Sequence, residues 1–89
     1  MRIAVDISLY PLDADYVPPI REFIDRIAAH PGLALEYNAL STQVSGDVDA
    51  VFAALRAEIG RTFEGPQRAV FVMKMLGGGE PPPAGSAPV

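Results

Sequence analysis

The side chains in this sequence that could do chemistry are mainly hydroxyls, amides and carboxylates on two short segments. Residues 8–12 read SLYPL and residues 41–46 read STQVSG, with Asp6 just before the first of them. Groups of this kind bind small molecules through hydrogen bonds and charge. Two interpretations are open at this point. The patch is either a binding site or a set of surface residues with good β propensity, especially Thr42 and Tyr10.

Catalytic arrangements are poorly represented. His30 is the only histidine, and it is predicted at a helix end, where a protonated ring interacts favourably with the helix dipole. Ser8 and Ser41 lie on or beside predicted strands, some distance from it, so a serine–histidine–acid arrangement is not expected. The paired acids at 13/15 and 47/49 occur at helix starts, where capping explains them. We therefore expect no catalytic residues and no enzymatic activity.

Composition excludes several classes of site and partner. The chain has no cysteine and one histidine, so thiolate and multi-histidine metal sites are not expected, and no cofactor is predicted. The net charge of −4 argues against nucleic acid and mildly favours a cationic ligand. No apolar run approaches the roughly 18 residues of a membrane span, and no signal-peptide pattern is present. We expect no membrane association and a cytoplasmic location.

The first polar segment belongs to a predicted strand over residues 2–10, in which apolar and other residues alternate. The apolar members, expected to face helices, are Ile3, Val5, Ile7 and Leu9. Asp6, Ser8 and Tyr10 then lie on the opposite, open face. Strand 41–46 carries the second polar segment and is expected to pair beside the first strand.

The remaining elements follow from apolar periodicity and turn residues. They are a helix starting near 17–19 and stopped by Pro31-Gly32, strands 33–38 and 41–46, a helix capped by Asp47 and closed by Gly65-Pro66, and a strand at 69–76. The order β-α-β-β-α-β predicts an α+β, ferredoxin-like fold. Its four-stranded antiparallel sheet should have the spatial order 4-1-3-2 with two helices on one face. Residues 1–76 form the predicted domain and residues 77–89 a Gly/Pro-rich C-terminal tail.

Three motifs together resemble a known family. SLYPL at 8–12, S-T-x-V-x-G at 41–46 and Gly-Leu at 32–33 are similar to those of the YkoF-like thiamine-binding proteins, over residues 1–76. The resemblance implies non-enzymatic binding of thiamine or its hydroxymethylpyrimidine half by a protein that assembles into dimers or tetramers. The Gly/Pro tail departs from the family's pattern.

The ligand that the resemblance implies assigns roles to the polar patch. Hydroxyls and amides would bond the pyrimidine edge, a tyrosine would stack on a ring, and Asp6 would offset the positive charge or bond the amine. The candidate binding residues are Asp6, Ser8, Tyr10, Asn38, Ser41 and Thr42. Tyr37 is the alternative to Tyr10 for stacking, although sheet packing is the favoured interpretation of Tyr37.

Self-association is predicted from the last strand and from the small size of the domain. The strand's two apolar faces are Phe71, Met73 and Met75 on one side, and Val70, Val72 and Leu76 on the other. Only one set can lie under the helices, so the other requires a partner chain. A homo-oligomer, either a dimer or a tetramer, is the expected state.

Three other functions stay open at this level. The first is an oligomerising regulatory module that senses another small metabolite, such as an amino acid. The second is a small enzyme, which would require a buried histidine or acid between sheet and helices. The third is a structural protein without a ligand.

Overall fold

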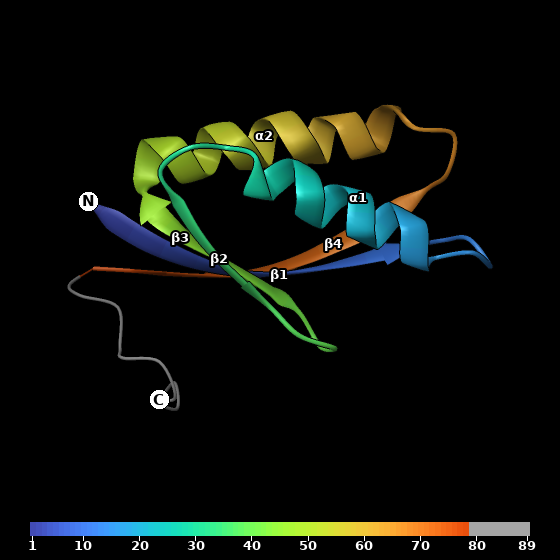
Figure 1. The fold of residues 1–89 in the computed structure, drawn as a ribbon, viewed down its shortest axis with the longest axis horizontal. Coiled ribbons are helices and arrows are strands. Elements are labelled where there is room, and N and C mark those ends of the chain that lie inside the picture. Colours follow the sequence, from blue (N-terminus) through green and yellow to red (C-terminus); the bar gives the residue numbers. More distant parts are fainter. Residues whose placement is uncertain (79–89) are drawn as a thin grey trace.

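The alternating residues at the start of the chain form β1, which lies inside a four-stranded sheet (Figure 1). The computed structural model describes residues 1–78. The elements are β1 (Arg2–Pro11), α1 (Val17–Ala28), β2 (Leu33–Tyr37), β3 (Thr42–Asp47), α2 (Val48–Glu64) and β4 (Ala69–Gly77). Both helices lie on the same face of the sheet. The predicted ferredoxin-like α+β fold is confirmed.

The sheet has the order β2-β3-β1-β4, and its three strand pairs are antiparallel. This is the predicted order 4-1-3-2. In the register of β1 on β3, Val5 pairs with Val44. In that of β2 on β3, Leu33 pairs with Gly46. β1 and β3 are the two central strands, as expected.

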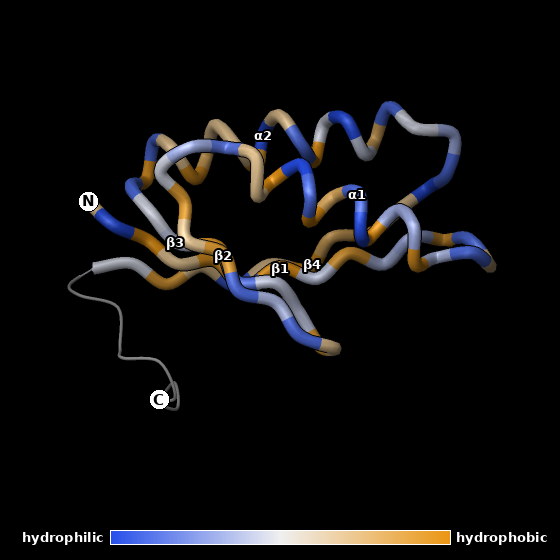
Figure 2. Tube along the Cα trace, in the orientation of Figure 1, coloured by the Kyte–Doolittle hydropathy of each residue, from blue (hydrophilic) through white to orange (hydrophobic). Residues whose placement is uncertain are grey.

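The core lies between the sheet and the two helices (Figure 2). Its buried apolar residues are Ile3, Val5, Ile7 and Leu9 of β1, Phe23 and Ile27 of α1, Val44 of β3, and Val51, Ala54 and Leu55 of α2. The alternation in β1 therefore turns its apolar residues toward the helices, as the sequence predicted. Val17 and Phe52, which continue the apolar periodicity of the two helices in the sequence, are instead exposed.

The helix ends follow local chemistry. Two prolines occupy the first turn of α1, where their missing N–H groups would have no helical partner. At the start of α2 the Asp47 carboxylate accepts a hydrogen bond from the Asp49 backbone N–H at 3.2 Å. This bond lowers the pKa of Asp47 and confirms the predicted cap.

One motif of the sequence is explained by backbone packing. A Cβ on Gly46 would lie 2.8 Å from the carbonyl oxygen of Gly32 and 3.1 Å from the Leu33 side chain. Gly32 itself has a φ of +79°, a conformation that glycine adopts most readily. The Gly-Leu pair and the glycine of S-T-x-V-x-G therefore meet where β2 starts against the end of β3.

β4 is an edge strand that keeps much apolar surface exposed. Phe71 packs on Phe23 and Phe63, with ring centroids 5.1 and 5.5 Å apart. Met73 and Met75, on the same side of the strand, remain 45% and 48% exposed. The helices leave much of this set uncovered, because they lie mainly over the other strands. Opposite-side residues of β4 are also exposed.

β4 ends at Gly77, one residue beyond the predicted strand 69–76, so the first residue of the predicted 77–89 tail belongs to the sheet. The rest of the predicted 77–89 tail, beyond residue 78, lies outside the described residues. Within residues 1–78, no helix is long and apolar enough to cross a membrane.

Candidate functional site

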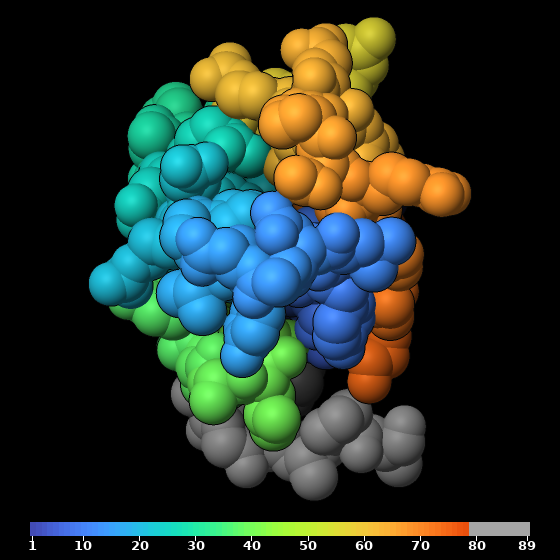
Figure 3. Space-filling view, turned by 90° about the vertical axis from the view of Figure 1, so that its right-hand side faces the viewer, coloured from blue at the N-terminus to red at the C-terminus, as the bar shows by residue number. Residues whose placement is uncertain are grey.

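The candidate site lies where β1 extends beyond its pairing with β3. The last β1–β3 pair joins Ile7 and Thr42, whereas β1 continues along β4 to the pair Pro11 and Ala69. Beyond the pair of Ile7 and Thr42, the β2–β3 hairpin diverges from β1 (Figure 1). A pocket of about 250 Å³ occupies this end of the molecule. Figure 3 views the molecule from this end, with the segment around residues 10–16 in blue and the hairpin tip in green.

Three elements line the pocket. The C-terminal half of β1 supplies one wall and the hairpin tip at residues 38–42 another, while the start of α1 closes the apolar side. The residues from α1 and its N-terminal boundary are Tyr16, Ile20, Phe23 and Ile24. A mostly apolar wall beside a few polar groups is the usual composition of a small-molecule site.

Most of the predicted site residues meet here. The lining includes Ser8, Tyr10, Asn38, Ser41 and Thr42. Asp6 is not among the lining residues, and neither is Tyr37. The structure therefore brings five predicted residues to one pocket and places the predicted carboxylate just behind it.

Thr42 reaches the pocket from the helix side of the sheet. Its antiparallel partner is Ile7, which is buried under the helices, and such partners share a face. Thr42 is 6% exposed. Thr42 therefore lies on the opposite face of the sheet from Ser8, because neighbouring residues of a strand point to opposite faces. The pocket includes both because it opens at the end of the sheet.

A network of hydrogen bonds holds the polar side of the pocket. The Ser41 hydroxyl donates to Asp6 Oδ1 at 2.5 Å, and the Ser8 hydroxyl donates to the Leu40 carbonyl at 3.4 Å. Asn38 Oδ1 accepts from the backbone N–H groups of Leu40 and Ser41 at 2.8 and 3.1 Å. These bonds fix the hairpin tip against β1.

Sequence reasoning missed the apolar half of the site. Ile20, Phe23 and Ile24 form a regular apolar stripe at helical spacing, and such a stripe by itself predicts core residues. Tyr16 and Leu40 were not singled out, although both line the pocket and stay more than half exposed. A tyrosine placed before a double proline at a helix start was the available signal, because that helix end must lie near the end of β1.

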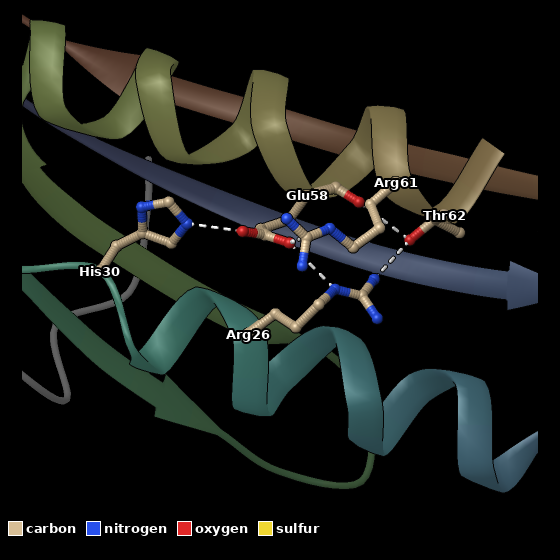
Figure 4. Close-up of polar contacts among 5 residues, drawn as sticks. All are labelled: Arg26, His30, Glu58, Arg61 and Thr62. Carbon is tan, nitrogen blue, oxygen red and sulfur yellow. Dashed lines mark hydrogen bonds and ion pairs between the residues drawn. The ribbon is translucent and has the colours of Figure 1, made fainter. Parts of the chain in front are cut away.

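One acid is buried elsewhere in the described residues, between the two helices. Glu58 of α2 lies in the interface between the helices and is 5% exposed (Figure 4). Its Oε1 accepts from Arg26 Nε at 2.9 Å, and its Oε2 lies 2.6 Å from His30 Nε2. Arg61 Nε lies 3.7 Å from Oε1, and Arg26 also donates to the Thr62 hydroxyl at 2.9 Å.

This helix-interface cluster, comprising Arg26, His30, Glu58, Arg61 and Thr62, is structural. Both carboxylate oxygens are occupied, and none of the five residues lines the pocket. The His30 hydrogen bond and neighbouring cations hold the pKa of Glu58 below its usual range against the effect of burial. His30 follows the end of α1 and contacts Glu58, so the prediction that it acts only on its own helix dipole was incomplete.

The described part of the chain shows no cluster of three or more histidine, aspartate or glutamate residues placed to hold a metal ion.

Comparisons with known proteins agree on the fold. A structure of a hypothetical protein from Methanocaldococcus jannaschii is 20% identical and superposes with a TM-score of 0.77 over 91% of this chain and 84% of its own. A Thermotoga maritima protein, proposed to act in thiamine biosynthesis or salvage, is 18% identical, with a TM-score of 0.74 over 84% and 82%. A Streptococcus pneumoniae protein is 15% identical, with a TM-score of 0.75 over 89% of each chain.

The search of curated proteins gave no significant match. The family model described as the YKOF-related family matches residues 2–75, which covers all but the first residue and the end of β4 in the folded part. The chain belongs to the YkoF-related family.

Proposed function

We propose that this protein binds thiamine or its hydroxymethylpyrimidine half in the pocket at the end of β1, without catalysing a reaction. The observation that carries the proposal is the meeting of Ser8, Tyr10, Asn38, Ser41 and Thr42 around one pocket. Family membership and the thiamine-related proposal for the Thermotoga maritima protein support the ligand class.

The size and lining of the pocket suit a small flat ring. Its volume of about 250 Å³ lies just below the range of roughly 300–1,000 Å³ that is usual for drug-sized ligands. The pyrimidine half therefore fits inside, and the thiazolium half of thiamine extends toward solvent. Ile20 and Phe23 offer apolar surface to the ring, and Tyr10 offers an aromatic face for stacking or for contact with the cation.

The chemistry of the lining supports binding over catalysis. Among the residues that line the pocket, tyrosine is the only type that ionises, and no histidine, carboxylate or lysine is present. General acid–base catalysis near neutral pH uses such groups within hydrogen-bond reach of the substrate. The proposal includes no catalytic residue, no metal and no further cofactor, and it keeps the cytoplasm as the expected location.

Self-association is part of the proposal. The apolar side chains of β4 are half exposed on both sides, and the strand is a sheet edge. Edge strands with exposed apolar residues pair readily with another chain. A second copy of this chain, whose own β4 has the same pattern, forms the homo-oligomer, a dimer or a tetramer.

Titration calorimetry tests the ligand class and the pocket together. Purified protein is titrated with thiamine, hydroxymethylpyrimidine and a panel of amino acids, and saturable heat is expected for one or both of the first two. Saturable binding of an amino acid alone would instead support the regulatory-module function.

A matched pair of variants locates the site. Ala39→Trp places a large side chain in the pocket lining, and Ala34→Trp makes the same change at an exposed β2 residue outside the lining. Ala39→Trp should weaken binding at least about tenfold, since an obstructed pocket loses most of its ring contacts. Equal affinity of the two variants would place the site elsewhere.

A further inference from the structure

The hydroxyl protons of the two pocket serines, Ser8 and Ser41, already form hydrogen bonds within the protein. Asp6 Oδ1 receives the Ser41 proton at 2.5 Å, and the Leu40 carbonyl receives the Ser8 proton at 3.4 Å. An ionised carboxylate and a carbonyl can only accept hydrogen bonds, so the direction of both bonds is fixed. The Ser41 bond is short and charge-assisted, whereas the Ser8 bond is long and weak.

A hydroxyl whose proton is engaged in this way presents only lone pairs to a ligand. Ser41 lines the pocket and Asp6 does not, so Asp6 acts on a ligand edge through the Ser41 oxygen. Asp6 forms no ion pair within residues 1–78, although Lys74 is its cross-strand neighbour on β4. Its carboxylate is therefore free to hold the Ser41 proton.

Asn38 supplies the opposite polarity. Two backbone N–H groups point at its Oδ1, which identifies that atom as the oxygen and leaves the side-chain NH₂ group as the donor that Asn38 can offer. The polar rim of the pocket thus contains an acceptor at Ser41 and a donor at Asn38. An edge with an N–H group beside an unprotonated ring nitrogen complements this pair.

We propose that Asp6 is a positioning residue that fixes Ser41 as a hydrogen-bond acceptor, so that the pocket selects a ligand edge carrying an amine over the same edge carrying a carbonyl oxygen. The inference rests on the proposed function and adds the polarity by which the site discriminates. It also replaces the expected direct contact of Asp6 with the ligand.

Thiamine and oxythiamine are the probes that isolate this effect. Oxythiamine carries an oxygen in place of the pyrimidine amine and a proton on the adjacent ring nitrogen, while both compounds keep the thiazolium cation. The ratio of their affinities therefore reports edge polarity, and any effect of the Asp6 charge on the cation cancels in that ratio. We expect the wild-type protein to prefer thiamine by about tenfold or more, because oxythiamine would face the Ser41 lone pairs with another acceptor.

Three variants separate positioning from charge. Asp6→Asn keeps an acceptor for the Ser41 proton. It should retain the preference for thiamine over oxythiamine, with the affinities for both compounds lowered alike. Asp6→Ala frees that proton, and Ser41→Ala removes the hydroxyl, so either change should bring the ratio within about twofold of one. The double variant with Asp6→Ala and Ser41→Ala should have the same ratio of thiamine to oxythiamine affinity as Ser41→Ala alone, since contributions that act through one atom are not additive.

Calorimetry of the four proteins and the wild type, with thermal unfolding to verify that each is folded, decides the matter. Equal wild-type affinities for the two compounds would overturn the inference while leaving the proposed function in place. A preference that survives Ser41→Ala would also overturn it. A wild-type protein that binds neither thiamine nor hydroxymethylpyrimidine would overturn the proposed function and the inference together.

Discussion

Thr42 is a buried side chain to which the proposed function assigns a contact with the ligand. Its hydroxyl makes no hydrogen bond to another group in residues 1–78, and no fully buried side-chain nitrogen or oxygen there lacks a partner. The oxygen therefore keeps some solvent contact, and the pocket is where Thr42 borders solvent. A hydroxyl placed this way beside an apolar wall gives direction to a ring that stacking alone would leave free to rotate.

Thr42→Val tests that role with almost no change of volume. The variant should lose about 1 kcal/mol of binding, roughly fivefold in affinity for thiamine and hydroxymethylpyrimidine alike. Its stability should be unchanged or raised, because a largely buried hydroxyl with no hydrogen bond to the protein is replaced by a methyl group. Calorimetry and thermal unfolding measure the two effects. Ser45→Ala, a change on the same strand outside the lining, is the control, and equal affinities of the two variants would remove Thr42 from the site.

At this scale the sequence predicted which residues come together better than how they are arranged. Ser41 and Thr42 are adjacent, so a strand directs them to opposite faces, and one binding face could not include both. The end of the sheet resolves this, because a pocket there is open to both faces. Asp6 was expected to contact the ligand, but its distance of 2.5 Å from the Ser41 hydroxyl could not be inferred from two positions far apart in the sequence.

The two helices are held to each other by a polar cluster as well as by apolar packing. Glu58 falls on the buried stripe of α2, beside Leu55 and Ala54, and its carboxylate pairs with Arg26 of α1 and with His30, which follows α1. Periodicity could have marked position 58 as buried, but its partners come from another element. Because α1 also forms the apolar wall of the pocket, this contact helps to hold that wall in place.

The pH dependence of stability follows from the lowered pKa of Glu58. A carboxyl whose folded pKa lies below its ordinary value of 4.5 stabilises the fold fully above that value, and the contribution is lost as the pH falls through the folded pKa. Urea unfolding should therefore show stability decreasing below about pH 4.5.

Glu58→Gln isolates this contribution. At pH 7 the variant should lose about 2 kcal/mol of unfolding free energy, since charged hydrogen bonds from a partly exposed arginine and histidine become neutral. The variant should also lose much of the decrease in stability that the wild-type protein shows below about pH 4.5. Glu64→Gln, at an exposed position ending the same helix, is the control. If both variants keep the wild-type pH profile, the cluster does not contribute as described.

For the whole molecule, topology was predictable and the shape of its end was not. Alternation in β1, two amphipathic helices and a short hairpin leave few arrangements that bury every apolar face. The divergence of the hairpin from β1, which opens the pocket, depends on how far each strand continues past its last pair. That is a property of the packed sheet, and residue patterns do not encode it locally.

Among the described residues, the exposed apolar strand β4 is the feature on which the proposed assembly rests. Light scattering at micromolar concentration should give the mass of a dimer or tetramer. Val72→Lys places a charge on the open side of the strand and should lower that mass toward the monomer, because burying an unpaired ammonium is costly. Ala53→Lys on the exposed surface of α2 should leave it unchanged. A monomeric wild-type protein would contradict the proposed assembly.

The central claim is that the pocket between β1, the hairpin tip and the start of α1 holds the ligand. A titration of ¹⁵N-labelled protein with thiamine, followed by amide chemical shifts, measures affinity and location in one experiment. The account predicts saturable shifts at Ser8, Leu40, Ser41 and Ile20, with little change near Glu58. Saturable shifts confined to other elements, or no shifts at millimolar thiamine and hydroxymethylpyrimidine, would contradict it.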